Sequence, residues 1–316
     1  MAHNDKSQIT FSVQHLIERN TKQRKKTQRI NRIVPLLLKI IASVSIVTTL
    51  GIIFTLANET LMFFQKIPLH SFLTGKEWLP FFEDPKFGIL PLICGTFLVT
   101  AIAMFVAIPI GLACAVFLSE YASNGARKVL KPMLELLAGI PTIVYGFFAL
   151  TVVTPLLQRI IPDLQFFNAI SPGIVIGFMM IPIIASLSED AMRAVAKGTK
   201  EASLALGATR FEMVKQVVFP SAFTGIIAAI ILAASRAIGE TMIVVIAAGS
   251  TPNVSLDPTQ SIQTLTAYIV QVSLGDAPHG TITYYSMYAV GATLFLFTLI
   301  MNIISQSIMR RFRRVT

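Results

Sequence analysis

The chain has 316 residues, of which 54% are hydrophobic and only 13% are charged, and its formal net charge at pH 7 is +10. Soluble domains carry roughly 25% charged residues, so this composition excludes an ordinary soluble enzyme and indicates an integral membrane protein. The positive charge then need not imply nucleic-acid binding, because membrane proteins concentrate Lys and Arg in their cytoplasmic segments.

Six regions of the sequence are long and apolar enough to cross a bilayer, which takes about 20 residues of helix. Helices are expected because backbone groups in lipid must hydrogen-bond within their own segment, and because the runs lack the alternation of a β-barrel. The predicted spans are Ile40–Asn58, Phe87–Ser119, Leu136–Gln158, Leu164–Ser188, Gln216 to about Gly249, and Gly280–Met309. The sequence therefore predicts an all-α membrane protein with six transmembrane helices.

The basic residues indicate how these spans are oriented. With both termini in the cytoplasm, 20 of the 26 Lys and Arg residues fall in cytoplasmic segments, four fall outside and two lie within spans. The positive-inside rule thus predicts cytoplasmic termini. The expected divisions are a basic arm (1–33), a first transmembrane helix (34–64), a periplasmic segment (65–87), a core of five transmembrane helices (88–309) with a cytoplasmic loop (189–220), and a basic tail (310–316).

The first half of the chain contains several local signals. Trp78, in the external segment, suits an anchor at the membrane interface. Pro91 and Pro109 are expected to bend the second span. Its two cysteines, Cys94 and Cys114, would lie about 30 Å apart on one helix, so they cannot form a disulfide with each other.

The third span contains Gly139, Pro141 and Gly146, which predict an irregular helix. Small and helix-breaking residues in a span usually permit close helix packing and sometimes line a translocation route. The sequence does not decide between these two roles for the three residues.

A polar, helix-prone stretch, Glu201–Pro220, separates the fourth and fifth spans. Gly207 should break it into two helices, and Glu201 near a helix start would suit the helix dipole. One interpretation is an ordinary amphipathic helix; the other is a rigid peg that binds a partner protein. The apolar stripe on which the first interpretation depends is Leu204, Leu206, Phe211, Val214 and Val217.

Two opposite charges, Arg236 and Glu240, stand within the fifth span. Four residues apart on a helix, they would share a face and could pair. A charge near the bilayer centre costs about 2.5 to 3.5 kcal/mol on insertion scales, so it usually faces a protein interior or an aqueous cavity. The pair could hold two helices together. Alternatively, Arg236 could attract an anion that crosses the membrane, while Glu240 keeps that anion from binding too tightly.

Motifs for enzymatic chemistry are absent from the sequence. No Walker A sequence occurs, the four histidines are scattered without metal-binding spacing, and no nucleophile-elbow sequence is present. The chain is therefore not expected to be an enzyme, and any ATP that drives it must be hydrolysed by another protein.

The stretch Glu201–Pro220 resembles the EAA motif of ABC-importer permeases. Together with FLTGKEWLPFFEDPKFGILPLICGT, LELLAGIPTIVYGFFAL and SRAIGETM, it is similar to the PstC-type permease subunit of bacterial phosphate ABC importers. The resemblance implies a type I importer (MetI-like) fold in the inner membrane. It also implies a heterodimer with a PstA-like permease, two copies of a PstB-like ATPase that bind ATP and Mg, and a PstS-like periplasmic phosphate-binding protein. No cofactor is implied for this chain.

The same resemblance assigns roles to particular residues. It ties Arg236 and Glu240 to the phosphate pathway, and it ties one group of residues to ATPase coupling: Glu201, Ala202, Ser203, Gly207, Ala208 and Pro220. Ser203 departs from the second Ala of the motif. Two other functions stay open, namely import of another tetrahedral oxyanion such as sulfate, molybdate or phosphonate, and a channel or secondary transporter that works without an ATPase.

Overall fold

The computed structural model describes the backbone of residues 3–312 and the side chains of residues 34–307. The basic side chains expected in the N-terminal arm and the C-terminal tail lie outside this set. The chain divides into two compact units, residues 1–57 and 58–316. Helix α1 (His3–Phe64) provides the whole of the described first unit and contains Pro35. Its segment Val34–Phe64 is long and apolar enough to span a membrane.

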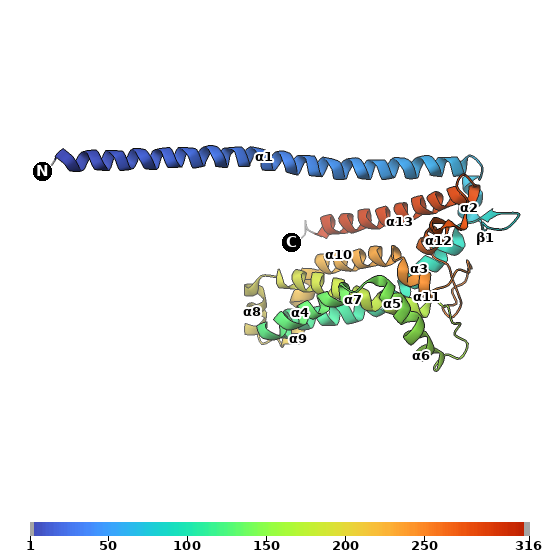
Figure 1. Cartoon of the computed structure of the whole chain (residues 1–316). Coiled ribbons are helices and arrows are strands. Elements are labelled where there is room, and N and C mark those ends of the chain that lie inside the picture. Colours follow the sequence, from blue (N-terminus) through green and yellow to red (C-terminus); the bar gives the residue numbers. More distant parts are fainter. Residues whose placement is uncertain (1–2, 313–316) are drawn as a thin grey trace. The chain divides into compact units, whose positions relative to one another are not determined.

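The second unit is almost entirely helical (Figure 1). The short segment after α1 contains helix α2 (Leu69–Thr74) and strands β1 (Trp78–Leu79) and β2 (Lys86–Phe87), which pair antiparallel with Trp78 opposite Phe87. The remaining α-helices are α3 (Leu90–Val116), α4 (Asn124–Ala138), α5 (Thr142–Phe148), α6 (Thr154–Gln158), α7 (Ile170–Arg193), α8 (Lys197–Ala205), α9 (Arg210–Met213), α10 (Phe219–Ile238), α11 (Met242–Ala247), α12 (Leu265–Gln271) and α13 (Ile282–Phe312). Four π-helical turns adjoin them: η1 (Phe117–Tyr121), η2 (Ala149–Val153), η3 (Val214–Val218) and η4 (Val272–Asp276).

Five helical segments in the described part of the chain could cross a membrane, or up to six if one bent pair counts as a span. That pair is α4 with the run Thr142–Gln158, and the two parts meet at 82°. Pro141 caps the start of α5, so the irregularity predicted for the third span is confirmed. Because α4 is amphipathic and begins well before Leu136, the bend separates it from the apolar part of the predicted span.

Helix α7 is the centre of the second unit, packed between α3 and α10. Its apolar window is 67% buried, the largest share among the candidate spans. Small residues permit this closeness: a Cβ added to Gly177 would lie 2.8 Å from the carbonyl oxygen of Ala103 on α3, and one added to Gly225 of α10 would lie 2.4 Å from Cβ of Ala191. Helices in membranes commonly associate through such small side chains.

A second core, rich in aromatic side chains, lies around the β1–β2 hairpin. Trp78 is only 1% exposed and its ring makes an edge-on contact with Tyr268, at a centroid distance of 4.8 Å. Phe72 and Phe87 make further edge-on contacts with Trp78, and Phe63 makes edge-on contacts with both phenylalanines. The expectation that Trp78 anchors the chain at the lipid surface is therefore wrong, because the hairpin folds back and buries the indole against α12.

Two other expectations concern helix α3. Pro91 lies in the first turn of α3, where its missing N–H leaves no intrahelical bond unmade, so the expected bend there is wrong. Cys94 and Cys114 are both free thiols of α3, as expected. Between α11 and α13 the chain contains α12 and η4.

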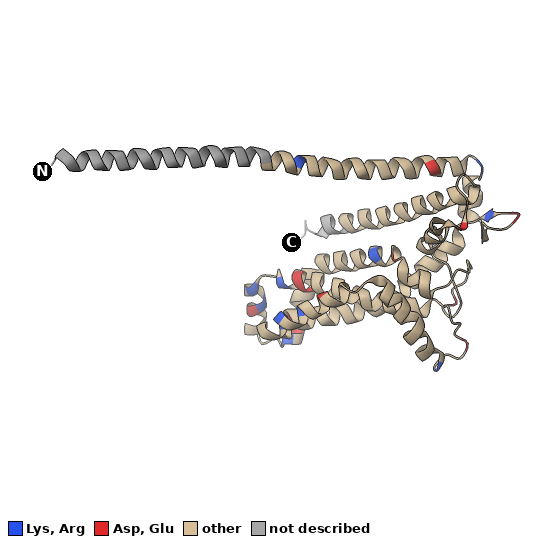
Figure 2. Cartoon of the chain, in the orientation of Figure 1, with Lys and Arg blue, Asp and Glu red and all other residues tan. Residues whose placement is uncertain are grey.

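Charged side chains are unevenly distributed in the second unit. Figure 2 shows many of them around α8, α9 and the neighbouring ends of α4 and α7, while most of the long helices carry almost none. The charge-rich end is thus where the stretch Glu201–Pro220 lies.

Candidate functional site: the polar stretch and the broken fifth span

The polar stretch folds as a helix, a turn and a helix. Helix α8 ends at Ala205, Gly207 adopts φ +92°, and α9 begins at Arg210. This left-handed conformation favours glycine because it has no Cβ, so the predicted break at Gly207 is confirmed. Thr209 and Glu212 close a reciprocal capping box at the start of α9, with N···O distances of 2.8 and 3.3 Å. The turn therefore has a defined geometry.

The residues predicted for coupling occupy both sides of this turn. Glu201 and Ala202 are exposed on α8, Ser203 and Ala208 are half-buried, and the amide of Ala208 donates to the carbonyl oxygen of Ser203 at 3.2 Å. Glu201 lies in the middle of α8 rather than in its first turn, so the expected interaction with the helix start is absent. Pro220 is the second residue of α10 and is exposed.

The apolar residues of this stretch do not form one packed stripe. Val214 is 6% exposed and belongs to a core cluster with Ala115 and Met192. By contrast, Leu206 is 90% exposed and Phe211 is 66% exposed. An ordinary amphipathic helix would bury these side chains, so the geometry favours a surface that a partner covers.

The fifth span is broken where the two charges lie. Helix α10 ends at Ile238, and α11 begins at Met242 after a non-helical linkage at Gly239. Arg236 is exposed, whereas Glu240 is 8% exposed. Among the described ion pairs with N···O within 4.0 Å, none joins them, and their interaction is a longer-range one. The prediction of a direct ion pair between Arg236 and Glu240 is therefore wrong, because the break in the helix moves Glu240 out of the helical register.

The backbone around Glu240 accounts for its position. Its carboxylate interacts with the backbone N–H groups of Thr241, Met242 and Ile243 at the start of α11. Its own carbonyl oxygen accepts a hydrogen bond from Oγ1 of Thr266 at 2.7 Å.

Several polar residues near this break were not singled out from the sequence. Thr266 is the second residue of α12. Thr264 caps the start of this helix, because its side chain accepts a hydrogen bond from the amide of Ala267 at 3.1 Å. Thr96 of α3 accepts a hydrogen bond from the amide of Leu265 at 3.0 Å. These threonines are far from Glu240 along the chain and belong to no motif, so only the folded chain brings them together.

Gly146 of the third span has a packing role. A Cβ at this position would lie 2.8 Å from Cδ1 of Ile246 and 3.2 Å from the carbonyl oxygen of Met242. Helix α5 can therefore approach α11 closely only with glycine here, and this contact supports the segment that follows Glu240. Of the two roles left open for Gly146, close packing is the one that the structure shows.

Comparison with known proteins gives consistent relatives. The family described as binding-protein-dependent transport system inner membrane component matches residues 107–314. A probable ABC transporter permease, YqgH of Bacillus subtilis, is 37% identical over 74% of this chain and 77% of its own length. The phosphate transport system permease PstC of Haemophilus influenzae is 33% identical over 75% of this chain and 79% of its own.

Solved transporters share the fold. A chain of the MetNI methionine ABC transporter in an inward-facing conformation has a TM-score of 0.53 at 16% identity, covering 71% of this chain and 93% of its own. A chain of a bacterial ABC transporter that imports the polysaccharide alginate has a TM-score of 0.54 at 15% identity, covering 83% and 96%. At these identities the likeness supports the MetI-like type I importer fold.

Proposed function

Because the chain belongs to the family of binding-protein-dependent transport system inner membrane components, we propose that it forms, with a paralogous permease, the pathway by which inorganic phosphate enters the cytoplasm. Its relatives establish that the chain is a multi-pass inner-membrane permease subunit of an ABC importer. Permeases of this family have no catalytic activity and bind no cofactor, and ATP is hydrolysed on a separate subunit.

Phosphate is proposed on two grounds. PstC proteins of several bacteria are about one-third identical over three quarters of this chain. The observation that carries the proposal within the chain is Arg236, an exposed cation in a span that makes no ion pair with the described residues. Such a group needs an aqueous cavity or an anion beside it. With Glu240 engaged by the backbone of α11, the positive charge of Arg236 stays available to a passing oxyanion.

The proposed assembly has four kinds of component. A PstA-like permease completes the pathway, two PstB-like ATPase subunits supply the energy, and a PstS-like protein delivers phosphate from the periplasm. Both termini lie in the cytoplasm. The stretch Glu201–Pro220 contacts the ATPase through its exposed turn, where Leu206 and Phe211 are uncovered.

Replacing the cation tests the substrate pathway. We expect Arg236→Gln to lower phosphate uptake by about tenfold or more, since each 1.4 kcal/mol of lost stabilisation is tenfold and hydrogen bonds to charged groups contribute about 1.5 to 3 kcal/mol. The measurement is uptake of radiolabelled phosphate by complexes of verified subunit composition. Arg159→Gln, which removes an exposed arginine beyond the third span, should leave uptake unchanged.

Normal uptake by assembled Arg236→Gln complexes would contradict the proposed role. Competition with sulfate and molybdate tests the substrate class in the same assay. If either anion replaces phosphate in wild-type complexes with higher uptake, the importer serves that oxyanion instead.

A further inference from the structure

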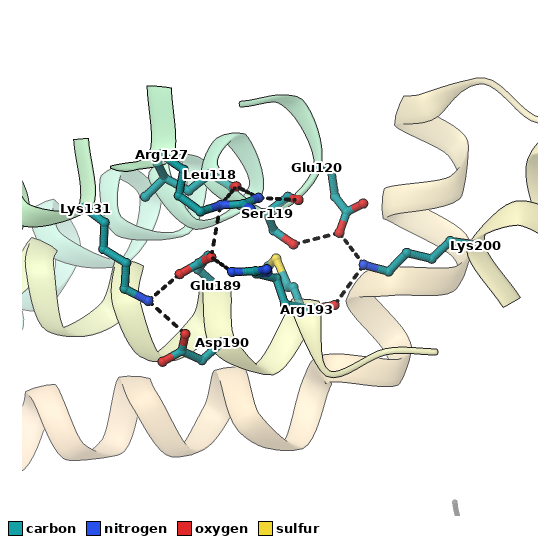
Figure 3. Close-up of polar contacts among 10 residues, drawn as sticks. Leu118, Ser119, Glu120, Arg127, Lys131, Glu189, Asp190, Arg193 and Lys200 are labelled. Atoms are coloured by element: carbon teal, nitrogen blue, oxygen red, sulfur yellow. Dashed lines mark hydrogen bonds and ion pairs between the residues drawn. The ribbon is translucent and has the colours of Figure 1, made fainter. Parts of the chain in front are cut away.

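Helix α8 is attached to the membrane core by one nearly buried ion pair. Nζ of Lys200 lies 2.6 Å from Oε1 of Glu120, on the π-helical end of α3, and 3.0 Å from the carbonyl oxygen of Met192 at the end of α7 (Figure 3). The Lys200 and Glu120 side chains are 14% and 8% exposed. Ser119 donates a further hydrogen bond of 2.7 Å to the same oxygen of Glu120. A single ammonium group therefore contacts both long core helices.

A second charge cluster joins the same core helices beside this pair. The carboxylate of Glu189 on α7 is fully buried and lies 2.6 Å from Nζ of Lys131, 3.4 Å from Nε of Arg127 and 3.5 Å from Nη1 of Arg193 (Figure 3). The guanidinium of Arg127 also donates to the carbonyl oxygens of Leu118 and Ser119 in η1. Helix α4, helix α7 and the η1 turn that carries Glu120 are thus tied together.

Apolar packing cannot supply the attachment of α8. None of its residues is buried, so displacement of the helix would cost little hydrophobic burial. A partly desolvated, charge-assisted hydrogen bond is short and directional, and it resists separation because each charge would be left without its partner. Movement of α8 should therefore pull on η1 and on the end of α7 through Lys200.

We propose that Lys200 and Glu120 are positioning residues that transmit movement of the ATPase-contacting stretch to α3 and α7. Glu189, with Arg127 and Lys131, makes the receiving ends of α4 and α7 move as one body. The inference rests on the coupling role given to Glu201–Pro220 above. It adds residues outside that stretch, contributed by a turn 80 positions earlier in the chain.

The test is the number of phosphate ions transported per ATP hydrolysed by the whole complex in proteoliposomes. Glu120→Gln removes the charge and keeps the shape of the side chain, so we expect the complexes to assemble. Their ratio of phosphate transported to ATP hydrolysed should fall by about two- to thirtyfold, which is the size of effect that substitutions along a coupling route have. Lys197→Gln is the matched control, because it removes an exposed lysine of the same helix that makes no ion pair in the described chain. Its ratio should stay at the wild-type value.

Charge exchange separates positioning from general stability. Glu120→Lys and Lys200→Glu should each lower the ratio, and the double variant should recover at least part of it. A wild-type ratio in Glu120→Gln would overturn the proposal. If the single variants do not assemble, the exchanged pair decides: a recovered ratio supports the proposal, and an assembled but uncoupled double variant contradicts it.

The two proposals fail in different ways. Wild-type complexes that do not transport phosphate would contradict the proposed substrate, and the ratio would then be measured with the oxyanion that they do transport. Wild-type complexes that transport phosphate beside Glu120→Gln complexes with an equal ratio would contradict only the positioning role.

Discussion

Glu240 is held by backbone groups, and this changes what its neighbour can do. In an unbroken helix a carboxylate four residues after Arg236 would neutralise it. Here the helix stops at Ile238, and the carboxylate turns to the amides that begin α11. Arg236 keeps its charge at the surface of α10, and Glu240 contributes mainly by fixing the course of the chain after the break.

A carboxylate in the loop between α11 and α12 gives a prediction that depends on pH. The hydroxyl of Thr259 donates to Asp257 at 2.7 Å and its backbone N–H donates at 3.0 Å, while Nε2 of Gln260 donates at 2.9 Å. These hydrogen bonds hold the pKa of Asp257 below its ordinary value of 3.8. A depressed pKa stabilises the folded loop above the ordinary pKa, and the contribution is lost as the pH falls through the folded value. The loop should therefore loosen only in strong acid.

Hydrogen exchange can measure this. We expect the amide of Thr259 in the wild-type protein to exchange faster once the pH falls below about 3.8, the ordinary Asp value, after correction for the intrinsic rate. Asp257→Asn, which cannot titrate, should show no such step. A step of equal size in both proteins would mean that another group controls the loop.

At the scale of the helices, the sequence predicted the features that depend on a few consecutive residues, namely spans and breaks. Apolar length located the spans, and Pro141 and Gly207 marked breaks, because a span and a break are properties of a few consecutive residues. The burial of Trp78 and the link between Lys200 and Glu120 depend on contacts between distant segments. No spacing within either segment carries that information. The break at Gly239 was not predicted either, since one glycine in a helix is usually tolerated.

Gly207 gives the prediction that belongs to the helices α8 and α9. Proline requires φ near −65°, whereas Gly207 has φ +92°, so Gly207→Pro cannot keep the turn and should strain it by roughly 1 to 3 kcal/mol. We expect the complex to remain in the membrane and to lose stimulation of its ATPase by phosphate-loaded binding protein. The measurement is ATP hydrolysis with and without that protein.

The control for this change is a glycine of α8 with ordinary helical geometry. Gly198 is the second residue of α8, and a Cβ there would meet nothing within 4 Å. Gly198→Ala should therefore keep full stimulation. Full stimulation in Gly207→Pro as well would show that the shape of the turn does not matter for coupling.

At the scale of the whole molecule, the surface of the isolated chain indicates an incomplete assembly. The apolar windows of Arg210–Ile238 and Ile282–Ser307 are only 28% and 11% buried. Lipid can cover such faces. Lipid is not expected to cover Leu206 and Phe211, because they lie at the charge-rich end of the second unit (Figure 2). Exposed apolar side chains among charges indicate a protein-binding surface.

Introducing charge on this surface should separate the permease from its ATPase. Burying a leucine or phenylalanine side chain contributes about 1.5 to 3 kcal/mol, so Leu206→Asp and Phe211→Asp should each weaken recovery of the ATPase by roughly tenfold or more. Co-purification of the ATPase with tagged permease measures this, and co-purification of the second permease in the same sample reports whether the membrane part is intact. Leu256→Asp places the same charge on a similarly exposed leucine in the loop between α11 and α12 and should retain the ATPase. Retention of the ATPase by all three variants would exclude the α8–α9 turn as the attachment point. Loss of both the ATPase and the second permease would indicate misfolding. In that case the conservative variants Leu206→Ala and Phe211→Ala decide, and we expect them to lose the ATPase selectively.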